Sequence, residues 1–152
     1  MNLYKLIRPL IFKLDPELAH DLVLKLLANN FILSQKSKRN IKLHQNIWGL
    51  DFTNPVGLAA GFDKDAIVIK PLSNLGFGFM EFGTVTLQPQ DGNFRPRIFR
   101  LEEDEAVINS LGFNNKGINN FLNNIRKFYK KTNIVIIGAN IGKNKVSQSP
   151  IN

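Results

Sequence analysis

The feature that most constrains the fold of this chain is an alternation of short apolar runs with helical patterns. The runs at 56–60, 79–85 and 134–137 have strand length and are largely apolar, as is typical of strands buried on both faces of a parallel sheet. Between them, 66–75 is weakly helical and 118–128 carries a clear helical stripe of apolar residues. This order of strands and helices predicts parallel strands joined by helices.

Two architectures have such an order, the open doubly wound sheet and the (β/α) barrel. A dinucleotide-binding open sheet would carry closely spaced glycines opening a helix after its first strand, and that pattern is missing. We therefore predict an α/β fold that forms the first part of a (β/α)8 TIM barrel, with about three of the eight barrel strands.

The end of the first predicted strand is the strongest candidate for a functional site. Four small residues leave almost no side-chain bulk there: Gly57, Ala59, Ala60 and Gly61. A flat or large molecule could therefore approach the backbone closely. Asp63 and Lys64 follow in the turn, where α/β proteins place their chemistry, and a lone ammonium suits a cofactor that develops negative charge. The alternative is that the glycines only relieve crowding in a barrel core and that Lys64 is a solvated loop residue.

Two short amphipathic helices are predicted in the first thirty residues. Apolar residues at positions 3, 6, 7, 10, 11 and 14 form one helical stripe, which Pro9 should kink or limit. A second helix begins at Asp15-Pro16-Glu17, with Asp15 as N-cap, and runs to about Asn30. Such a pair can lie in a membrane interface or pack on the parent domain, and most amphipathic helices pack. The polar, basic stretch 35–42 is predicted to be a linker.

Two additional pairs of short strands are predicted outside the alternating pattern. The stretch 47–52 surrounds Gly49 and is expected to form a small hairpin. The segments 97–101 and 106–109 are strand-like and flank an acidic tip.

The composition excludes several classes of protein. The apolar fraction of 43% and the charged fraction of 21% are those of a globular chain. Cysteine is absent, which excludes disulfides, cysteine-ligated zinc and iron–sulfur clusters held by this chain, and no metal site is predicted. No apolar run reaches the roughly 18 residues of a membrane-spanning helix, and no secretory signal is evident, so a cytosolic location is expected.

The formal charge of +8 is concentrated toward the two ends of the chain. Residues 1–45 hold eight Lys/Arg against three Asp/Glu, and residues 116–145 hold seven against none, whereas 46–115 hold five against nine. Basic segments suit either nucleic acid or an anionic membrane surface. Because no nucleic-acid-binding motif is present, we expect no nucleic-acid partner and favour the membrane surface.

Five stretches together form a specific combination of motifs: Asn54–Lys64, Glu81–Thr86, Arg95–Arg100, Ile108–Asn115 and Asn140–Lys145. In these motifs the chain resembles the N-terminal portion of class 2, quinone-dependent dihydroorotate dehydrogenases. The resemblance covers nearly the whole chain, although members of that family are considerably longer.

The resemblance implies an FMN on top of the barrel and a pyrimidine beside it. The residues that it places along the flavin are Ala60, Gly61, Phe62, Asp63, Lys64, Thr84 and Asn140. The residues that it places around dihydroorotate or orotate are Lys64, Asn109, Ser110, Leu111, Gly112 and Phe113. A cationic Lys64 would stabilise the anionic reduced flavin. The side-chain amides of Asn109 and Asn140 suit a ligand edge that alternates donors and acceptors.

The implied function is oxidation of (S)-dihydroorotate to orotate with FMN and a membrane quinone, in de novo pyrimidine biosynthesis. Residues 1–42 would then be the two-helix extension and linker on the membrane and quinone side, and residues 43–152 an incomplete FMN-binding barrel. The expected location is peripheral, on the cytoplasmic face of the cell membrane.

The chain departs from the family pattern at the catalytic base. The family uses a serine in a Ser-Ser-Pro-Asn context; Ser149-Pro150 resembles it faintly but comes too early, so no catalytic residue is assigned. The later strands and the loops that hold phosphate are also unmatched, so this chain alone is expected to be inactive, with an open sheet edge and a missing C-terminal half. The alternative hypothesis is a non-catalytic remnant that acts at most as a membrane- or quinone-binding module.

Overall fold

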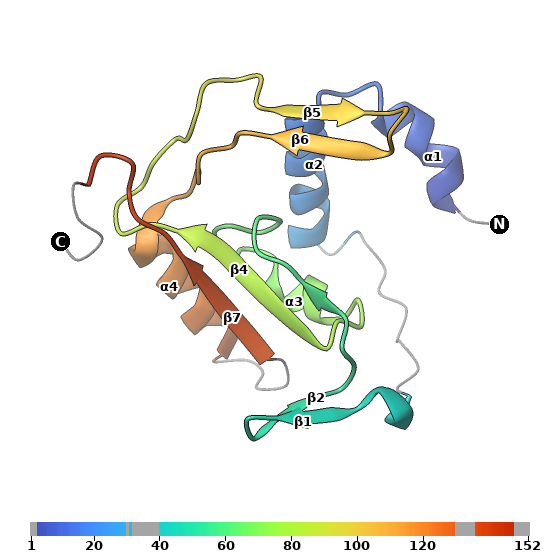
Figure 1. The fold of residues 1–152 in the computed structure, drawn as a ribbon, viewed down its shortest axis with the longest axis vertical. Coiled ribbons are helices and arrows are strands. Elements are labelled where there is room, and N and C mark those ends of the chain that lie inside the picture. The colour runs from blue at the N-terminus through green and yellow to red at the C-terminus, as the bar shows by residue number, and fades with distance from the viewer. Residues whose placement is uncertain (1–2, 30, 32–39, 130–135, 148–152) are drawn as a thin grey trace.

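The computed structural model describes residues 3–29, 31, 40–129 and 136–147 (Figure 1). Its helices are α1 (Leu3–Ile11), α2 (Pro16–Ala28), the short 3₁₀ helix η1 (Ile41–Leu43), α3 (Ile69–Ser73) and α4 (Gly117–Tyr129). Its strands are β1 (Gln45–Ile47), β2 (Leu50–Phe52), β3 (Gly57–Leu58), β4 (Phe79–Val85), β5 (Ile98–Leu101), β6 (Ala106–Asn109) and β7 (Ile136–Ile141).

The centre of the fold is a parallel sheet in the order β3-β4-β7, as the alternating pattern predicts. Strand β4 has the predicted bounds and pairs on both sides, with Met80 opposite Leu58 in β3 and opposite Ile137 in β7. The chain passes through α3 between the first two strands and through α4 before the third. This connection is the one expected of the first part of a (β/α) barrel.

The first and third strands differ in length from their prediction. Strand β3 is only Gly57–Leu58, because the chain leaves the regular strand at Ala59. The amide of Gly61 then donates a hydrogen bond to the carbonyl of Gly83. Strand β7 extends to Ile141, past the predicted end at 137, because the small residues Gly138 and Ala139 pair directly with β4. Asn140 therefore lies within a strand rather than in a following turn. Positions 134 and 135 lie outside the described residues.

Buried apolar side chains on one face of the sheet form the core. Helices α3 and α4 cover this face (Figure 1). Met80, Phe82 and Val85 of β4 are each 0% exposed, and residues from three helices pack around them: Leu27, Ile69, Leu72, Phe121 and Phe128. Full burial of side chains of this size contributes roughly 1.5–3 kcal/mol each.

The two predicted N-terminal helices are present, and their apolar faces are only partly covered. Asp15 caps α2 as predicted, its Oδ1 accepting from the amides of Glu17 and Leu18, each at 3.0 Å. Helix α2 inserts Leu27 into the core, which leaves Leu18, Leu22 and Leu26 exposed on another face, and α1 exposes Leu6, Ile7 and Leu10. Within the described residues, no helix is both long enough and apolar enough to cross a membrane.

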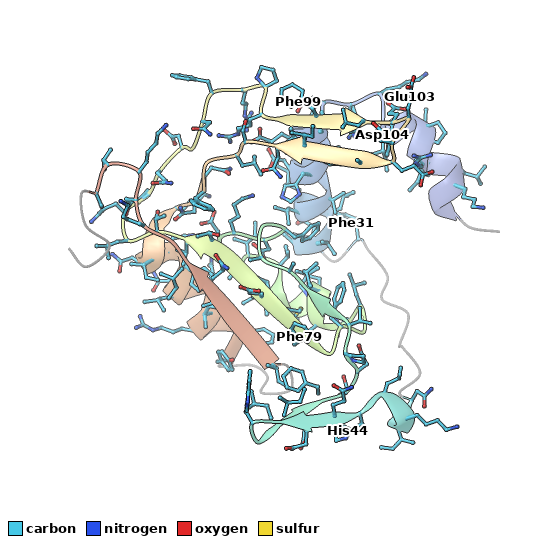
Figure 2. The ribbon with its side chains drawn as sticks, viewed as in Figure 1. Phe31, His44, Phe79, Phe99, Glu103 and Asp104 are labelled. Carbon is cyan, nitrogen blue, oxygen red and sulfur yellow. The ribbon has the colours of Figure 1, made fainter. Side chains whose placement is uncertain are left out.

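Two antiparallel hairpins lie at opposite ends of the molecule (Figure 1). The predicted hairpin around Gly49 is β1–β2, and the positive φ of Trp48 and Gly49 at its turn matches a two-residue hairpin loop. It contacts the sheet through Phe52, whose ring meets that of Phe79 edge-on at 5.6 Å. The second hairpin, β5–β6, lies over α2, and Figure 2 shows its acidic tip, Glu103 and Asp104, beside α1.

Candidate functional site

The turn after β3 is held by a buried carboxylate. Asp63 is 1% exposed, and its two oxygens accept from the amides of Ile67 at 3.0 Å and Val68 at 2.8 Å. Burial raises the pKa of Asp63, and these hydrogen bonds oppose the rise. Because its carboxylate is occupied within the fold, any ligand contact of Asp63 would come from its backbone.

Lys64 is the cation of this turn, and its ammonium is directed back over the small residues. The Nζ atom donates to the carbonyl of Gly61 at 2.9 Å. Burial lowers the pKa of Lys64, and the largest opposing influence is the charge of Glu17. The side chain is therefore a shielded ammonium rather than a solvated loop residue, which favours the functional interpretation of this turn.

Polar side chains join the ends of β4 and β7 beside this turn. Thr84 Oγ1 donates to Asn140 Oδ1 at 2.5 Å, and Asn140 Nδ2 donates to Glu81 Oε1 at 2.9 Å. Gly83 has a φ of +114°, and a Cβ atom there would collide with the carbonyl of Asn140. The strand ends therefore meet as bare backbone, with a hydroxyl and an amide at the edge.

The loop 109–113 follows β6 and faces the same strand ends. Its main chain is tied down from outside: Ser110 N donates to Arg97 O at 2.9 Å, and Gln90 Nε2 donates to Gly112 O at 3.0 Å. Asn93 binds it twice, from its side chain to Ser110 O at 2.7 Å and from its amide to Leu111 O at 3.0 Å.

A cavity of about 400 Å³ lies between the β3 turn, the strand ends and this loop. It is lined by Ala60, Gly61, Lys64, Thr84, Asn109, Leu111, Gly112 and Phe113. Eight of the residues implied by the family resemblance, separated by up to 53 positions, are thus brought to one space. Asn140 reaches it only through Thr84, and Ser110 is exposed and does not line it.

A second, smaller cavity of about 150 Å³ lies between α2 and the other side of the same turn. It shares Gly61, Lys64 and Leu111 with the first, and it is where Phe62 and Asp63 are found. His20 of α2 meets the ring of Phe62 edge-on at 5.2 Å, and burial lowers the pKa of this histidine. The turn is therefore a thin partition between two cavities.

Several residues that support the site received no role from the sequence. Asn115 is 7% exposed; its Oδ1 accepts from the amides of Thr86 and Gly117, and its Nδ2 donates to Thr86 Oγ1 and Phe113 O. Asn144 similarly pairs with both backbone groups of Gln88. Both asparagines stand within the motif stretches, and it is their burial, invisible in the sequence, that distinguishes them from turn residues.

The lining of the larger cavity is suited to a flat, polar ligand and includes one cation. Small residues and backbone form one wall, an ammonium stands at its edge, and side-chain amide and hydroxyl groups offer donors and acceptors. Among the residues that the structure describes, no group of three or more histidine, cysteine or acidic side chains is placed to hold a metal ion.

Comparisons with known proteins identify the family. The sequence profile of the dihydroorotate dehydrogenase family matches residues 42–151. Proteins named dihydroorotate dehydrogenase (quinone) are similar along the chain: that of Azorhizobium caulinodans is 48% identical over 97% of the chain, and that of Psychrobacter sp. is 50% identical over 95%. The chain spans 42% of the length of each of these two relatives.

Solved structures are similar as well. The structure of DHODH from Eimeria tenella in complex with ferulenol has a TM-score of 0.83 and 43% identity over 89% of this chain, which covers 38% of that one. The ligand-free structure of the same enzyme has a TM-score of 0.82, with 39% of its chain covered.

Proposed function

Because this chain belongs to the dihydroorotate dehydrogenase family, we propose that it forms the flavin- and pyrimidine-binding part of an enzyme that oxidises (S)-dihydroorotate to orotate in pyrimidine biosynthesis. The observation that carries the proposal is the convergence of eight motif residues on one cavity. Residues 1–42 would serve the membrane and quinone side, and residues 43–152 the flavin side.

FMN fits the residues present at this cavity. Gly61 lines the cavity with a φ of +106°, and a Cβ atom there would meet nothing within 4 Å, so its backbone faces open space that a flat ring could approach closely. Ala60, Gly61 and Thr84 would lie along the ring, with Asn140 holding the Thr84 hydroxyl and Lys64 at the ring's edge. When bound, FMN would accept a hydride and pass two electrons on to a quinone.

The described residues of the chain would bind and orient the substrate. Conversion to orotate removes a hydride from one ring carbon and a proton from its neighbour, so the ring must be held in one orientation. The side-chain amide of Asn109 can pair with the pyrimidine edge, and Leu111 and Phe113 would exclude water from its face. A cationic Lys64 would stabilise the negative charge that the flavin gains with the hydride.

The proton acceptor is not among the residues that line this cavity in the described part of the chain, where Lys64 is the titratable group. Positions 149 and 150, which faintly resemble the family's serine motif, lie outside the described residues. Full activity would therefore depend on residues that the remaining length of the relatives contains.

A flavin-reduction assay tests the proposal. The protein, loaded with FMN and mixed where necessary with a chain carrying the remaining strands, should lose its oxidised flavin absorbance when dihydroorotate is added. A Lys64→Met variant should slow this bleaching by about a hundredfold, the scale of removing one fixed charge from a reaction site. Absence of bleaching in the completed wild-type protein would reject the proposal, and mass measurement of the native product, detected by peptides from 54–64, would show whether a second chain is needed.

We further propose a peripheral position on the cytoplasmic face of an anionic membrane; the exposed apolar faces of α1 and α2 support the membrane contact. Leu6 and Leu10 are 55% and 65% exposed, and the same end of the chain is basic. Liposome binding should fall strongly in a Leu6→Ser, Leu10→Ser variant. Trp48→Ser is the matched control, because this side chain is 94% exposed at the opposite end of the molecule, and an equal loss from it would exclude the N-terminal helices as the contact.

A further inference from the structure

A buried arginine just before β5 uses all three nitrogens of its guanidinium group within the fold. Arg97 is 5% exposed. Its Nε and Nη2 donate to the carboxylate of Glu17, at 3.0 Å and 2.6 Å for the shorter contacts, and its Nη1 donates to the carbonyls of Asp91 and Asn93, each at 2.7 Å. A planar guanidinium group donates in several fixed directions and so fixes the relative positions of its acceptors, whereas a lysine ammonium is a single charge on a flexible side chain.

The acidic end of this pair belongs to helix α2. Glu17 lies in its first turn, is 6% exposed, and faces Arg97 across 80 positions of sequence. The hydrogen bond from Arg97 lowers the pKa of Glu17 most strongly, so the pair is ionic at neutral pH. Burying two charges adds little net stability in general, because desolvation offsets their attraction, and such pairs can instead fix geometry.

The other end of the connection is the loop 109–113, which the cavity uses. The carbonyl of Arg97 accepts a hydrogen bond from the amide of Ser110 at 2.9 Å. Asn93, whose carbonyl Arg97 holds, binds both Ser110 and Leu111. The backbone of Gly92 lies so close to Leu111 that a Cβ there would collide with the Leu111 carbonyl. The segment held by Arg97 therefore sets where the loop can lie.

From this chain of contacts we propose that Glu17 and Arg97 are positioning residues: they transmit the placement of helix α2 to the loop 109–113, which takes its ligand-binding shape only while α2 is seated. The identity of the ligand rests on the proposed function, whereas the transmission itself does not. Since coupling between two sites is reciprocal, binding at the loop would also hold α2 in place.

Arg95 provides a matched control within the same cluster. It donates to the same Glu17 oxygen at 2.9 Å, but its side chain is 66% exposed. No hydrogen bond in the described structure joins its side chain to the 91–93 segment or to the loop. A lysine at position 95 or at position 97 makes the same chemical change, and only the second interrupts the connection.

The experiment compares Arg97→Lys with Arg95→Lys in the full chain, by amide hydrogen exchange and by orotate titration of the FMN-loaded protein. Arg97→Lys should accelerate exchange in the peptide covering 109–113 while the peptide covering β4 stays protected. It should weaken orotate binding at least about tenfold, as a displaced binding loop does, with FMN retention unchanged. Arg95→Lys should leave both exchange and orotate affinity within twofold of the wild type, in keeping with a weak exposed ion pair.

Unchanged exchange at 109–113 in Arg97→Lys, or equal effects of the two variants, would overturn the inference. If Arg97→Lys also accelerates hydrogen exchange in β4, the second variant to measure is Glu17→Gln, which keeps the volume of the side chain. Faster exchange of β4 in both variants would mean that the pair only stabilises the fold in general, and this would also overturn the inference. A wild type that retains no FMN even when completed with the remaining strands refutes the proposed function, and the exchange comparison still decides the role of the pair. Rapid hydrogen exchange at 109–113 in the wild type itself would contradict the proposed positioning role of Glu17 and Arg97.

Discussion

The sheet with its helices and the junction between α2 and the β5–β6 hairpin are held together by different forces. In the sheet region, Met80, Phe82 and Val85 are completely buried against apolar neighbours from α3 and α4. At the junction, the principal contacts are charged: Glu17 with two arginines, and Arg100 with the carbonyls of Phe12 and Leu14 at 3.2 Å and 2.8 Å. Apolar contacts are non-directional, whereas these bonds specify angles, and the ion pairs of Glu17 respond to pH.

This difference divides the candidate site. Thr84 and Asn140 stand on the apolar-packed sheet, whereas the loop 109–113 is tied to the charged junction. The proposed flavin wall is thus built on the part that tolerates changes in solution conditions, and the proposed pyrimidine loop on the part that responds to them.

The largest expected effect comes from truncating the core. Phe82→Ala should lower the free energy of unfolding by about 3–5 kcal/mol, because it removes a completely buried ring and leaves a cavity. Chemical denaturation followed by circular dichroism measures this change. Protection of amides from hydrogen exchange should fall in both the sheet and the junction, because α2 packs on the core through Leu27. Protection that persists in the junction alone would show that the junction does not depend on the core.

Removing the acid of the junction should have a smaller and more local effect. Glu17→Ala leaves the buried guanidinium of Arg97 without its carboxylate, at a cost of roughly 3 kcal/mol. Hydrogen exchange should show faster opening of α2 and of 109–113, with β4 unchanged. Equal acceleration across β4 would mean that the two regions form one cooperative unit.

Acid should separate the two regions without any mutation. The pKa of Glu17 is held below its ordinary value of 4.5, chiefly by the hydrogen bond from Arg97. Its contribution to stability is therefore complete above about pH 4.5 and is lost as the pH falls through the lowered pKa of the folded state. Asp63 has the opposite sign: burial raises its pKa, so its protonation favours the folded state as the pH falls.

An NMR titration from neutral pH to below pH 4.5 would follow both regions in one sample. The Arg97 side-chain signal and the amides of α2 should change first, while the methyl signals of Met80 and Val85 persist. Simultaneous loss of all these signals would contradict the separation.

The smallest expected effect is the loss of a helix cap. Asp15→Ala removes two hydrogen bonds to the first turn of α2 and should lower stability by about 1 kcal/mol. Asp15→Asn is the control, because it keeps an accepting oxygen and should restore most of the loss. Thermal unfolding of the three proteins measures both steps.

Local chemistry made much of this fold predictable. The Asp-Pro-Glu start of α2, the turn at Gly49, the bounds of β4 and the helical stripe of α4 each follow from neighbouring residues, and the structure contains all of them. The family motifs likewise indicated eight residues of the larger cavity. Whether those residues bind FMN and orotate remains a prediction.

The features that escaped prediction depend on contacts between distant segments. Glu17 is unremarkable in sequence as an acid in a helix's first turn, and only the fold brings it to Arg97. The length of β7 is set by its pairing with β4. Small residues such as Gly138 permit this pairing, but they do not allow it to be predicted from the sequence. Asn115 also needed its buried neighbours before its supporting role could be recognised.

The backbone of Gly61, which lines the larger cavity with a φ of +106° and has open space where a Cβ atom would stand, has a consequence for adaptation of the site. A surface made of main chain has no rotamers to restrict, so the ordering cost of roughly 0.5–1.5 kcal/mol per side chain would not arise if the proposed ring binds against it. By the same reasoning it offers no side chain to exchange. New ligand preferences would therefore come from the rim, at positions such as Leu111 and Phe113, and a mutagenesis library that spares Gly61 and varies the rim should retain the most folded members.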